Sequence, residues 1–125
     1  MRLATGVDLI EIQRLQDAIG RHGERFLQRI FTPHECLEAN GSPSSLAARF
    51  AAKEAVAKAL QTGIGLVAWR EIEIRTGPYG EPVLLLHGAA ASLASELGLS
   101  AWSLSLSHTA THAIALVVAL GEPAA

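Results

Sequence analysis

The stretch RFAAKEAVAKAL, residues 49–60, consists mostly of alanine, the residue with the highest helix propensity, and so predicts a helix. Its bulky members are apolar and favour burial: Phe50, Val56 and Leu60. The same stretch nevertheless carries four charged residues: Arg49, Lys53, Glu54 and Lys58. The two lysines are the only ones in the chain. A helix whose composition favours burial therefore holds a compact group of charges.

The spacing of these charges allows two interpretations. Residues four apart share a helix face, so Arg49 neighbours Lys53, and Glu54 neighbours Lys58 in the favourable Glu-then-Lys order. One interpretation is a solvated face with a single surface ion pair, worth at most roughly a few tenths of a kcal/mol. The other starts from the apolar surroundings, which leave no broad polar face, so that the charges need a bound ion or a polyphosphate as partner.

A carboxylate flanked by three cations suits Mg²⁺ with phosphates, because the acid holds the metal and the bases neutralise the remaining oxygens. Mg²⁺ usually takes one or two protein carboxylates, which directs attention to a second acid in an apolar context. Asp8, in the segment GVDLI of residues 6–10, is the clearest one. The residues alone leave open whether Asp8 and Glu54 form a metal site or Asp8 only accepts hydrogen bonds at a strand end.

Outward from the central helix, local patterns predict four helices and five strands. Helices are expected at residues 11–30, 33–38, 45–61 and 89–97, and strands at 3–10, 71–75, 83–87, 103–107 and 113–120. The first helix contains breaks near Gly20 and Gly23. Further signals mark helix ends: a capping box from Thr32 to Glu35, a cap at Ser44 or Ser45, and a left-handed end at Gly63. The expected fold is α+β in a single domain, residues 1–125, with a long central helix packed on a mainly antiparallel sheet.

The composition excludes several classes of protein. The 125 residues include 50% hydrophobic and 18% charged residues, which is typical of a globular domain. The net charge of −2 gives no global indication of binding to nucleic acid or to an anionic membrane. No apolar run reaches the roughly 18 residues of a membrane-spanning helix. Cys36 is the only cysteine, which excludes a disulfide framework and favours a reducing, cytoplasmic compartment.

Three stretches together resemble a known family. GVDLIEI at residues 6–12, RFAAKEAVAKAL at residues 49–60 and SLSHT at residues 105–109 occur in this order and at this spacing in small holo-(acyl carrier protein) synthases. These enzymes are the short type of 4′-phosphopantetheinyl transferase. The segments TGIG at 62–65 and GEP at 80–82 also fit, so the resemblance spans essentially the whole chain. It implies a 4′-phosphopantetheinyl transferase-like fold.

The resemblance also implies an activity. Such enzymes transfer the 4′-phosphopantetheine group from coenzyme A to a serine of apo acyl carrier protein, in support of fatty acid biosynthesis. The other product is adenosine 3′,5′-bisphosphate. By the resemblance, Asp8 and Glu54 bind Mg²⁺, and Lys58 contacts the transferred phosphate. All three are thereby expected to be catalytic, and either Glu54 or a Mg²⁺-bound water near it takes the proton of the serine.

The remaining expected roles also follow from the resemblance. Coenzyme A contacts are expected at eight positions: Arg49, Lys53, Lys58, Gly63, Gly80, Pro82, His108 and Thr109. Without the resemblance, His108 has the alternative of a simple turn residue between two strands. Tyr79 departs from the family pattern, because a small polar residue is expected there. The family forms homotrimers, in which neighbouring subunits share each active site.

Four arginines of the first helix acquire a role as well: Arg14, Arg21, Arg25 and Arg29. Acyl carrier proteins are strongly acidic, and the family docks them on a basic first helix, which speeds encounter and sets orientation. The alternative is a solvated helix face with Asp17 and Glu24 as local partners. Two competing functions remain for the whole chain. One is a non-catalytic module that binds coenzyme A or a carrier protein, and the other is a structural trimer held by charged pairs between subunits.

Overall fold

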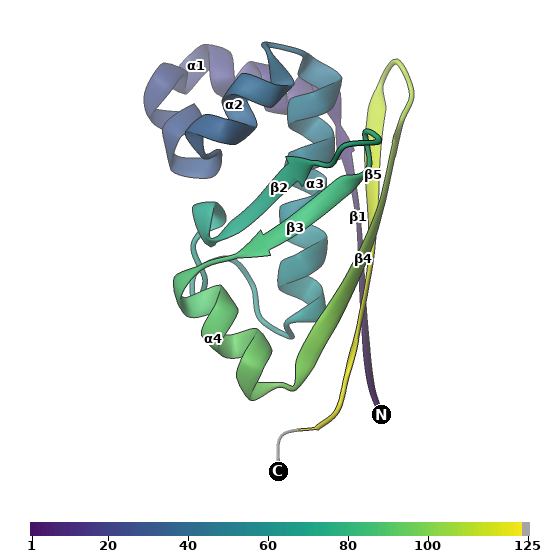
Figure 1. Cartoon of the computed structure of the whole chain (residues 1–125). Helices are drawn as coiled ribbons and strands as arrows, with labels where there is room; N and C mark the ends of the chain where they lie inside the picture. Colours follow the sequence, from purple (N-terminus) through teal and green to yellow (C-terminus); the bar gives the residue numbers. More distant parts are fainter. Residues whose placement is uncertain (124–125) are drawn as a thin grey trace.

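The computed structural model describes residues 1–123. Its elements follow in the order β1 (Arg2–Glu11), α1 (Ile12–Ile30), α2 (Pro33–Ala39), α3 (Pro43–Ala59), a 3₁₀ turn (Trp69–Glu71), β2 (Ile72–Thr76), β3 (Pro82–Leu86), α4 (Gly88–Glu96), β4 (Leu99–His108) and β5 (His112–Gly121). Figure 1 shows α3 at the centre, with the long strands β1, β4 and β5 along one side. None of the helices in residues 1–123 has both the length and the apolar character needed to cross a membrane.

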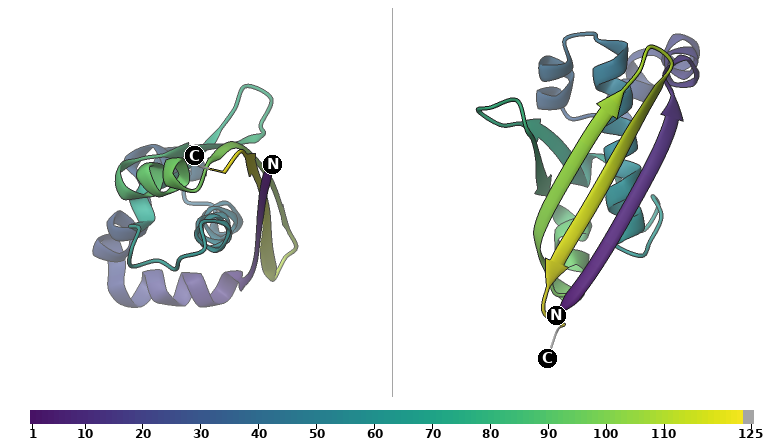
Figure 2. Two further views of the ribbon diagram at one scale, coloured as in Figure 1. Left: turned by 90° about the horizontal axis from the view of Figure 1, so that it is seen from below. Right: turned by 90° about the vertical axis from the view of Figure 1, so that its right-hand side faces the viewer.

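The strands form two antiparallel sheets. In the larger one β5 lies between β1 and β4, and in the smaller one β2 pairs with β3 as a hairpin. Viewed along α3, the sheet covers one side of the helix, and α1, α4 and the hairpin lie around the others (Figure 2). The predicted α+β fold with a long central helix on a mainly antiparallel sheet is confirmed.

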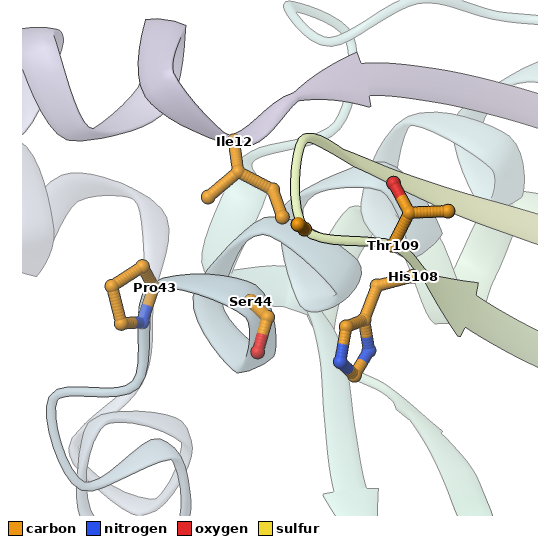
Figure 3. Close-up of a pocket in the computed structure, with 6 residues that line it drawn as sticks. Ile12, Pro43, Ser44, His108 and Thr109 are labelled. Carbon is orange, nitrogen blue, oxygen red and sulfur yellow. The ribbon is translucent and has the colours of Figure 1, made fainter.

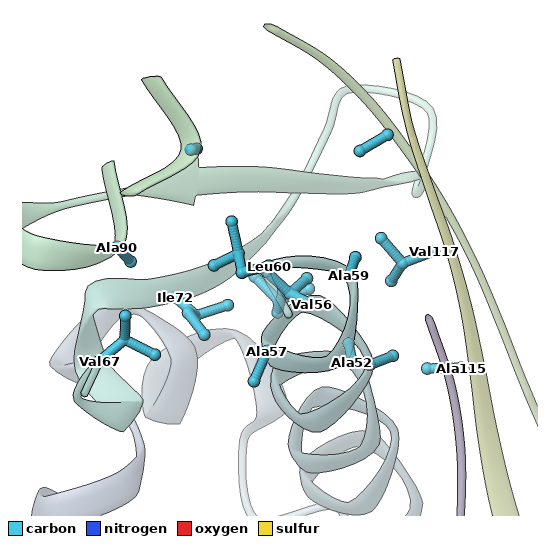
Figure 4. Packing of buried hydrophobic residues seen from close by; sticks show 14 of the residues in the cluster. Ala52, Val56, Ala57, Ala59, Leu60, Val67, Ile72, Ala90, Ala115 and Val117 are labelled. Atoms are coloured by element: carbon cyan, nitrogen blue, oxygen red, sulfur yellow. The ribbon is translucent and has the colours of Figure 1, made fainter. Parts of the chain in front are cut away.

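Small side chains let α3 lie close to the large sheet. The inward-facing residues of β5 are fully buried and mostly alanine: Ala113, Ala115, Val117 and Ala119. They meet a helix that is buried around most of its circumference, with Ala52, Val56 and Ala59 in the shared core (Figure 4). Alanine on both surfaces shortens the distance between helix and sheet without leaving a void.

The closest approach is between β1 and α3. A methyl group built on Gly6 would lie 1.9 Å from the carbonyl oxygen of Ala55. Only a residue without a side chain therefore fits at this point of β1. The contact has a consequence for function, because it brings Asp8 of β1 alongside the turn of α3 that carries Glu54 and Lys58.

Two predicted ends of α3 are wrong. The helix is capped by Ser42, whose Oγ accepts a hydrogen bond of 3.3 Å from the backbone N–H of Ser45, and neither Ser44 nor Ser45 is the cap. Pro43 explains the earlier start, since its fixed φ suits the first helical position. At the other end Gln61, with φ of 61°, adopts the left-handed conformation that was expected at Gly63.

Other boundaries differ less. The break in α1 occurs only at Gly23, where φ is 66° and ψ is −149°, and Gly20 remains helical. The strand expected at residues 103–107 extends over all of β4, from Leu99 to His108. The pairing with β5 shifts register between Leu99 and Ala101, so the simple alternation of the sequence begins only after this irregularity.

We predict that Gly6→Ala destabilises the protein by about 1–3 kcal/mol, the usual cost of overpacking a close contact. The added methyl group must displace β1 from the backbone of α3. Gly20→Ala is the matched control, because nothing lies within 4 Å of its added methyl group. This control should be neutral or slightly stabilising in a helix. Urea denaturation of both variants measures the difference, and equal stabilities would contradict the proposed tight contact.

Candidate active site

Lys53 lies in the protein interior. Its side chain is 0% exposed, and its Nζ donates to Glu35 Oε1 at 2.7 Å and to the backbone carbonyls of Trp69 and Ile72. These three acceptors satisfy all three hydrogens of the ammonium group. Burial lowers the pKa of Lys53 below its usual 10.5, and the carboxylate of Glu35 opposes this shift. The structure therefore does not place Lys53 at a surface where it could contact coenzyme A phosphates, which corrects the expectation for this residue.

Glu35 joins three elements around this lysine. It belongs to the predicted capping box of α2, which is confirmed by hydrogen bonds between Thr32 and Glu35 in both directions. Its second oxygen accepts from the backbone N–H of Ile74 at 2.8 Å. One buried carboxylate thus connects α2, α3 and β2, and this fixes the rotation of α3 about its own axis.

Asp8 and Glu54 line one cavity of about 370 Å³, together with Arg14 and apolar residues of α1 and α3. Lys58 lies beside them and donates to the carbonyl of Val7 at 2.7 Å and to Asp8 Oδ1 at 3.3 Å. The interpretation that paired Lys58 with Glu54 along the helix is therefore wrong, since the ion pair crosses from α3 to β1. The structure brings together the three residues that were expected to be catalytic.

The two carboxylates are placed unfavourably for each other. Burial raises the pKa of Glu54 above its usual 4.5, the negative charge of Asp8 raises it further, and the ammonium of Lys58 opposes both effects. A cation between the two acids would relieve this repulsion. Residues 1–123 contain no cluster of three or more His, Cys, Asp or Glu side chains that could hold a metal. Mg²⁺ is nevertheless commonly bound by only one or two protein carboxylates, with waters and phosphates as its other ligands, so Asp8 and Glu54 fit this metal.

Arg49 lies on another side of α3 and is only 8% exposed. Its guanidinium donates to the hydroxyls of Ser45 and Thr76, the latter at 2.9 Å. Its Nε is buried without a hydrogen-bond partner in the part of the chain that the structure describes. Thr76 ends β2 and is paired with Pro82, the first residue of β3, so Arg49 lies near the hairpin end that carries Gly80 and Pro82, two other residues that were expected to contact coenzyme A.

A second cavity, of about 530 Å³, contains two further expected contacts. It is lined by Ser44 at the start of α3 and by His108 and Thr109 at the end of β4 (Figure 3). The hydroxyl of Thr109 accepts from the backbone N–H of His112 at 3.0 Å, which shapes the connection to β5. This cavity and that of Asp8 and Glu54 share no lining residue. Gly63 lies beyond the C-terminal end of α3 and is exposed.

The four arginines of α1 are all exposed. Arg14 lines the cavity of Asp8 and Glu54, which we call the acid cavity. The other three arginines line a neighbouring cavity beside the same helix: Arg21, Arg25 and Arg29. Phe26 lines both cavities and so makes them adjacent. Within residues 1–123 none of these arginines forms an ion pair, so the expected local partners Asp17 and Glu24 do not neutralise them.

A family model described as the 4′-phosphopantetheinyl transferase superfamily matches residues 4–117. The chain belongs to this superfamily. Curated relatives carry the name holo-[acyl-carrier-protein] synthase. The one from Herpetosiphon aurantiacus is 53% identical over 95% of this chain and 99% of its own length. The one from Moorella thermoacetica is 50% identical over 96% of this chain and 94% of its own length.

Solved structures agree with this assignment. The holo-[acyl-carrier-protein] synthase of Helicobacter pylori in complex with coenzyme A has a TM-score of 0.85 and 34% identity, over 93% of this chain and 99% of that one. The synthase of Neisseria meningitidis has a TM-score of 0.85 and 40% identity, over 94% and 97%. The resemblance found in the sequence motifs is thereby confirmed.

Sequence reasoning missed the partners of the two buried cations. Glu35 was identified only as a capping residue, and Ser45 and Thr76 were given no part in holding Arg49. The signal for Lys53 was present in the sequence, because a lysine surrounded by alanines on a buried helix requires an acidic partner. The identity of that partner depends on the packing of α2 against α3, which no local pattern reports.

We predict that Glu54→Gln stabilises the protein in the absence of metal and coenzyme A. The ionised carboxylate is disfavoured in the folded state, because its pKa is raised there. This destabilisation is present above the folded pKa of Glu54 and disappears as pH falls toward the usual value of 4.5. The variant should therefore have a higher Tm than the wild type at pH 7.5, and the gain should shrink at pH 4.

Glu96→Gln provides the control, since Glu96 is an exposed acid on α4 outside the site. Its Tm should follow that of the wild type at both pH values. A Glu54→Gln variant that is less stable than the wild type at pH 7.5 would show that the carboxylate is well compensated and that the repulsion with Asp8 is unimportant.

Proposed function

We propose that this chain transfers 4′-phosphopantetheine from coenzyme A to a serine of apo acyl carrier protein, in support of fatty acid biosynthesis. The observation that carries the proposal is the cavity lined by Asp8 and Glu54, with Lys58 paired to Asp8 beside it, in a superfamily whose chemistry needs these groups. The relatives named holo-[acyl-carrier-protein] synthase, and the related structure with coenzyme A, support the choice of substrates. A reducing cytoplasm suits a chain with Cys36 as its only cysteine.

We propose that the reaction uses Mg²⁺, which Asp8 and Glu54 would hold. When bound, the metal neutralises negative charge on the diphosphate of coenzyme A. The repulsion between the two partly buried carboxylates supports this assignment, because partial burial and the charge of Asp8 both disfavour an ionised Glu54 when no cation is present.

Glu54 and Lys58 have separate roles in the transfer step. The serine oxygen forms a bond to the β-phosphorus of coenzyme A, and the bond from that phosphorus to the leaving oxygen breaks, which releases adenosine 3′,5′-bisphosphate. Glu54 lines the cavity, where this carboxylate or a water beside it takes the hydroxyl proton. Lys58 is 53% exposed and is hydrogen-bonded only to Val7 and Asp8, so its ammonium can turn toward the transferred phosphate. Phosphoryl transfer relies mainly on this placement of charges.

The contacts to coenzyme A come from two sides of α3. Arg49 and Glu54 are five residues apart, which places them about 140° apart around the helix axis. A phosphate held by Glu54 and Lys58 of one chain therefore lies on a different side of α3 from Arg49 of the same chain, and His108 and Thr109 line a separate cavity. We propose that these last three residues, with Gly80 and Pro82, serve the site of a neighbouring subunit. Gly63 lies beyond the C-terminal end of α3, the end that carries Lys58.

The outer face of the large sheet supports assembly into a homotrimer. No element of residues 1–123 covers this face (Figure 2). It exposes large apolar side chains on β1 and β5: Leu3, Val7, Leu9, Ile114, Leu116 and Leu120. Several of them face each other across the strands, as Val7 does with Leu116. A contiguous exposed apolar surface of this kind usually marks an interface.

The arginines of α1 form the docking surface for the carrier protein. They are exposed and form no ion pair within the described residues, so their charges are available to a strongly acidic carrier protein. Arg14 lines the cavity of Asp8 and Glu54, and the other arginines follow along the helix. A carrier protein bound along α1 would therefore present its serine at the acid cavity, with Phe26 as an apolar contact between the two regions.

The decisive experiment measures the intact mass of a purified apo acyl carrier protein after incubation with this protein, coenzyme A and Mg²⁺. We expect a gain of one phosphopantetheine group, which a chelator abolishes. Asp8→Asn and Glu54→Gln should lose the reaction by at least about a hundredfold, the usual scale for a group that acts on the transition state. Glu96→Gln, which changes an exposed acid far from the site, should retain it.

A folded protein that binds coenzyme A but modifies none of several carrier proteins would overturn the transferase and favour a binding module. A protein that binds no coenzyme A would leave the charged pairs with a structural role between subunits.

We predict that Leu116→Glu converts the trimer into smaller species, because it places a charge in the apolar face shared by the subunits. Leu37→Glu is the matched control, since Leu37 is also exposed, at 77%, but lies on α2 away from the sheet. Light scattering after size-exclusion chromatography measures the mass of each. The wild type and Leu37→Glu should have three times the mass of the chain. A wild-type monomer would contradict the shared active site.

A further inference from the structure

Arg49 is a buried cation whose partners are neutral. The residue is only 8% exposed, and the two hydrogen-bond acceptors of its guanidinium are the hydroxyls of Ser45 and Thr76. A guanidinium cannot lose its proton in a protein, so its positive charge is permanent. Within residues 1–123 no carboxylate forms an ion pair with it. Hydroxyl dipoles orient the group, but they do not neutralise it.

The charges near Arg49 do not neutralise its positive charge. Lys53, one turn further along α3, is neutralised by Glu35 and has no remaining donor or acceptor for Arg49. The charge of Arg49 also opposes the protonated form of Lys53, and so contributes to its lowered pKa. A cation that is buried, permanent and uncompensated is stable only beside an anion that the chain itself does not supply.

Thr76 holds one nitrogen of the guanidinium from an exposed position at the end of β2. Thr76 is exposed, and its Oγ accepts from Nη2 of Arg49 at 2.9 Å. Its backbone is fixed in turn, because its N–H donates to Glu38 Oε2 at 2.9 Å and the other oxygen of Glu38 accepts from Arg75 Nε at 2.9 Å. The threonine therefore links the guanidinium to a rigid point at the end of β2.

We propose that Thr76 is a positioning residue, whose hydroxyl holds the guanidinium of Arg49 in the orientation that receives a phosphate group of coenzyme A. The inference rests on the proposed function. Thr76 acts through Arg49, and its loss leaves the arginine in place but free to turn. Ser45 fixes the other nitrogen from within α3, so the two hydroxyls together determine the plane of the guanidinium. That plane matters because phosphate oxygens are bound best by the coplanar N–H groups of arginine.

The test compares Thr76→Val, which removes the hydroxyl at nearly constant shape, with Thr76→Ser, which retains it. Calorimetric titration with coenzyme A should show about fivefold to tenfold weaker binding for Thr76→Val, the range expected for loss of one hydrogen bond. Thr76→Ser should bind like the wild type. In the transfer reaction, Thr76→Val should raise KM for coenzyme A by a similar factor and leave kcat nearly unchanged.

A double-mutant cycle separates positioning from general destabilisation. If Thr76 acts through Arg49, then Thr76→Val should weaken binding no further in an Arg49→Ala background. Titration with 3′-dephospho-coenzyme A identifies the phosphate. If the effect of Thr76→Val vanishes with this ligand, Arg49 holds the 3′-phosphate, and if it persists, Arg49 holds the diphosphate. Both results support the proposal.

Three results would overturn it: binding by Thr76→Val equal to that of the wild type, equal weakening by Thr76→Val and Thr76→Ser, or additive effects of Thr76→Val and Arg49→Ala. Each would leave the proposed transferase intact, because the wild type would still bind coenzyme A and modify the carrier protein. A wild type that binds no coenzyme A would overturn the proposed function and this inference together.

Discussion

The ion pair between Lys53 and Glu35 is the interaction on which the rest of the structure depends. Both side chains are 0% exposed, and the carboxylate also accepts from the backbone of Thr32 and Ile74. A buried pair of this kind adds little net stability, because desolvation offsets most of the attraction, but an unpaired member is costly. Any rotation or sliding of α3 would separate the two charges. The pair therefore selects one placement of α3 against α2 and β2 among the many that an alanine-rich helix could adopt.

That placement assigns a role to each remaining charge of α3. Because Lys53 points inward, Glu54 is turned toward β1 and shares a cavity with Asp8. Lys58, one turn later, reaches Asp8 at 3.3 Å, and Arg49, one turn earlier than Lys53, reaches Thr76 on β2. The glycine at position 6 completes the arrangement, since it lets β1 approach the helix backbone closely. The site thus combines a compensated charge in the core with an uncompensated Arg49 and with two acids that share only Lys58, so that ligands can supply the missing partners.

The sequence was sufficient to predict those parts of the structure that depend on local interactions. The capping box of Thr32 and Glu35 lies within one helical turn, and the strand predicted at residues 113–120 lies entirely within β5. The sequence was insufficient where contacts between distant segments determine a strand's extent or a side chain's position. The register shift near Leu99 concealed the first part of β4, and the ion pair of Lys53 joins residues 18 positions apart. The position of Lys53 in the motif indicated a phosphate contact, whereas the packing of α2 turned it into the interior.

The separation of charges around α3 also bears on why so small a chain would assemble. The helix is buried on most sides, so it can expose functional groups only in the few directions where neighbouring elements leave gaps. Glu54 occupies one such gap and Arg49 another, and an angle of about 140° around the axis divides them. Coenzyme A carries a diphosphate and a separate 3′-phosphate, so it can take cations from both directions. Rotating α3 would not bring Arg49 and Glu54 together, because the angle between them belongs to the helix itself. In the proposed homotrimer a second copy presents its own Arg49 to the first chain's Glu54, so that the two directions of charge meet in one shared site.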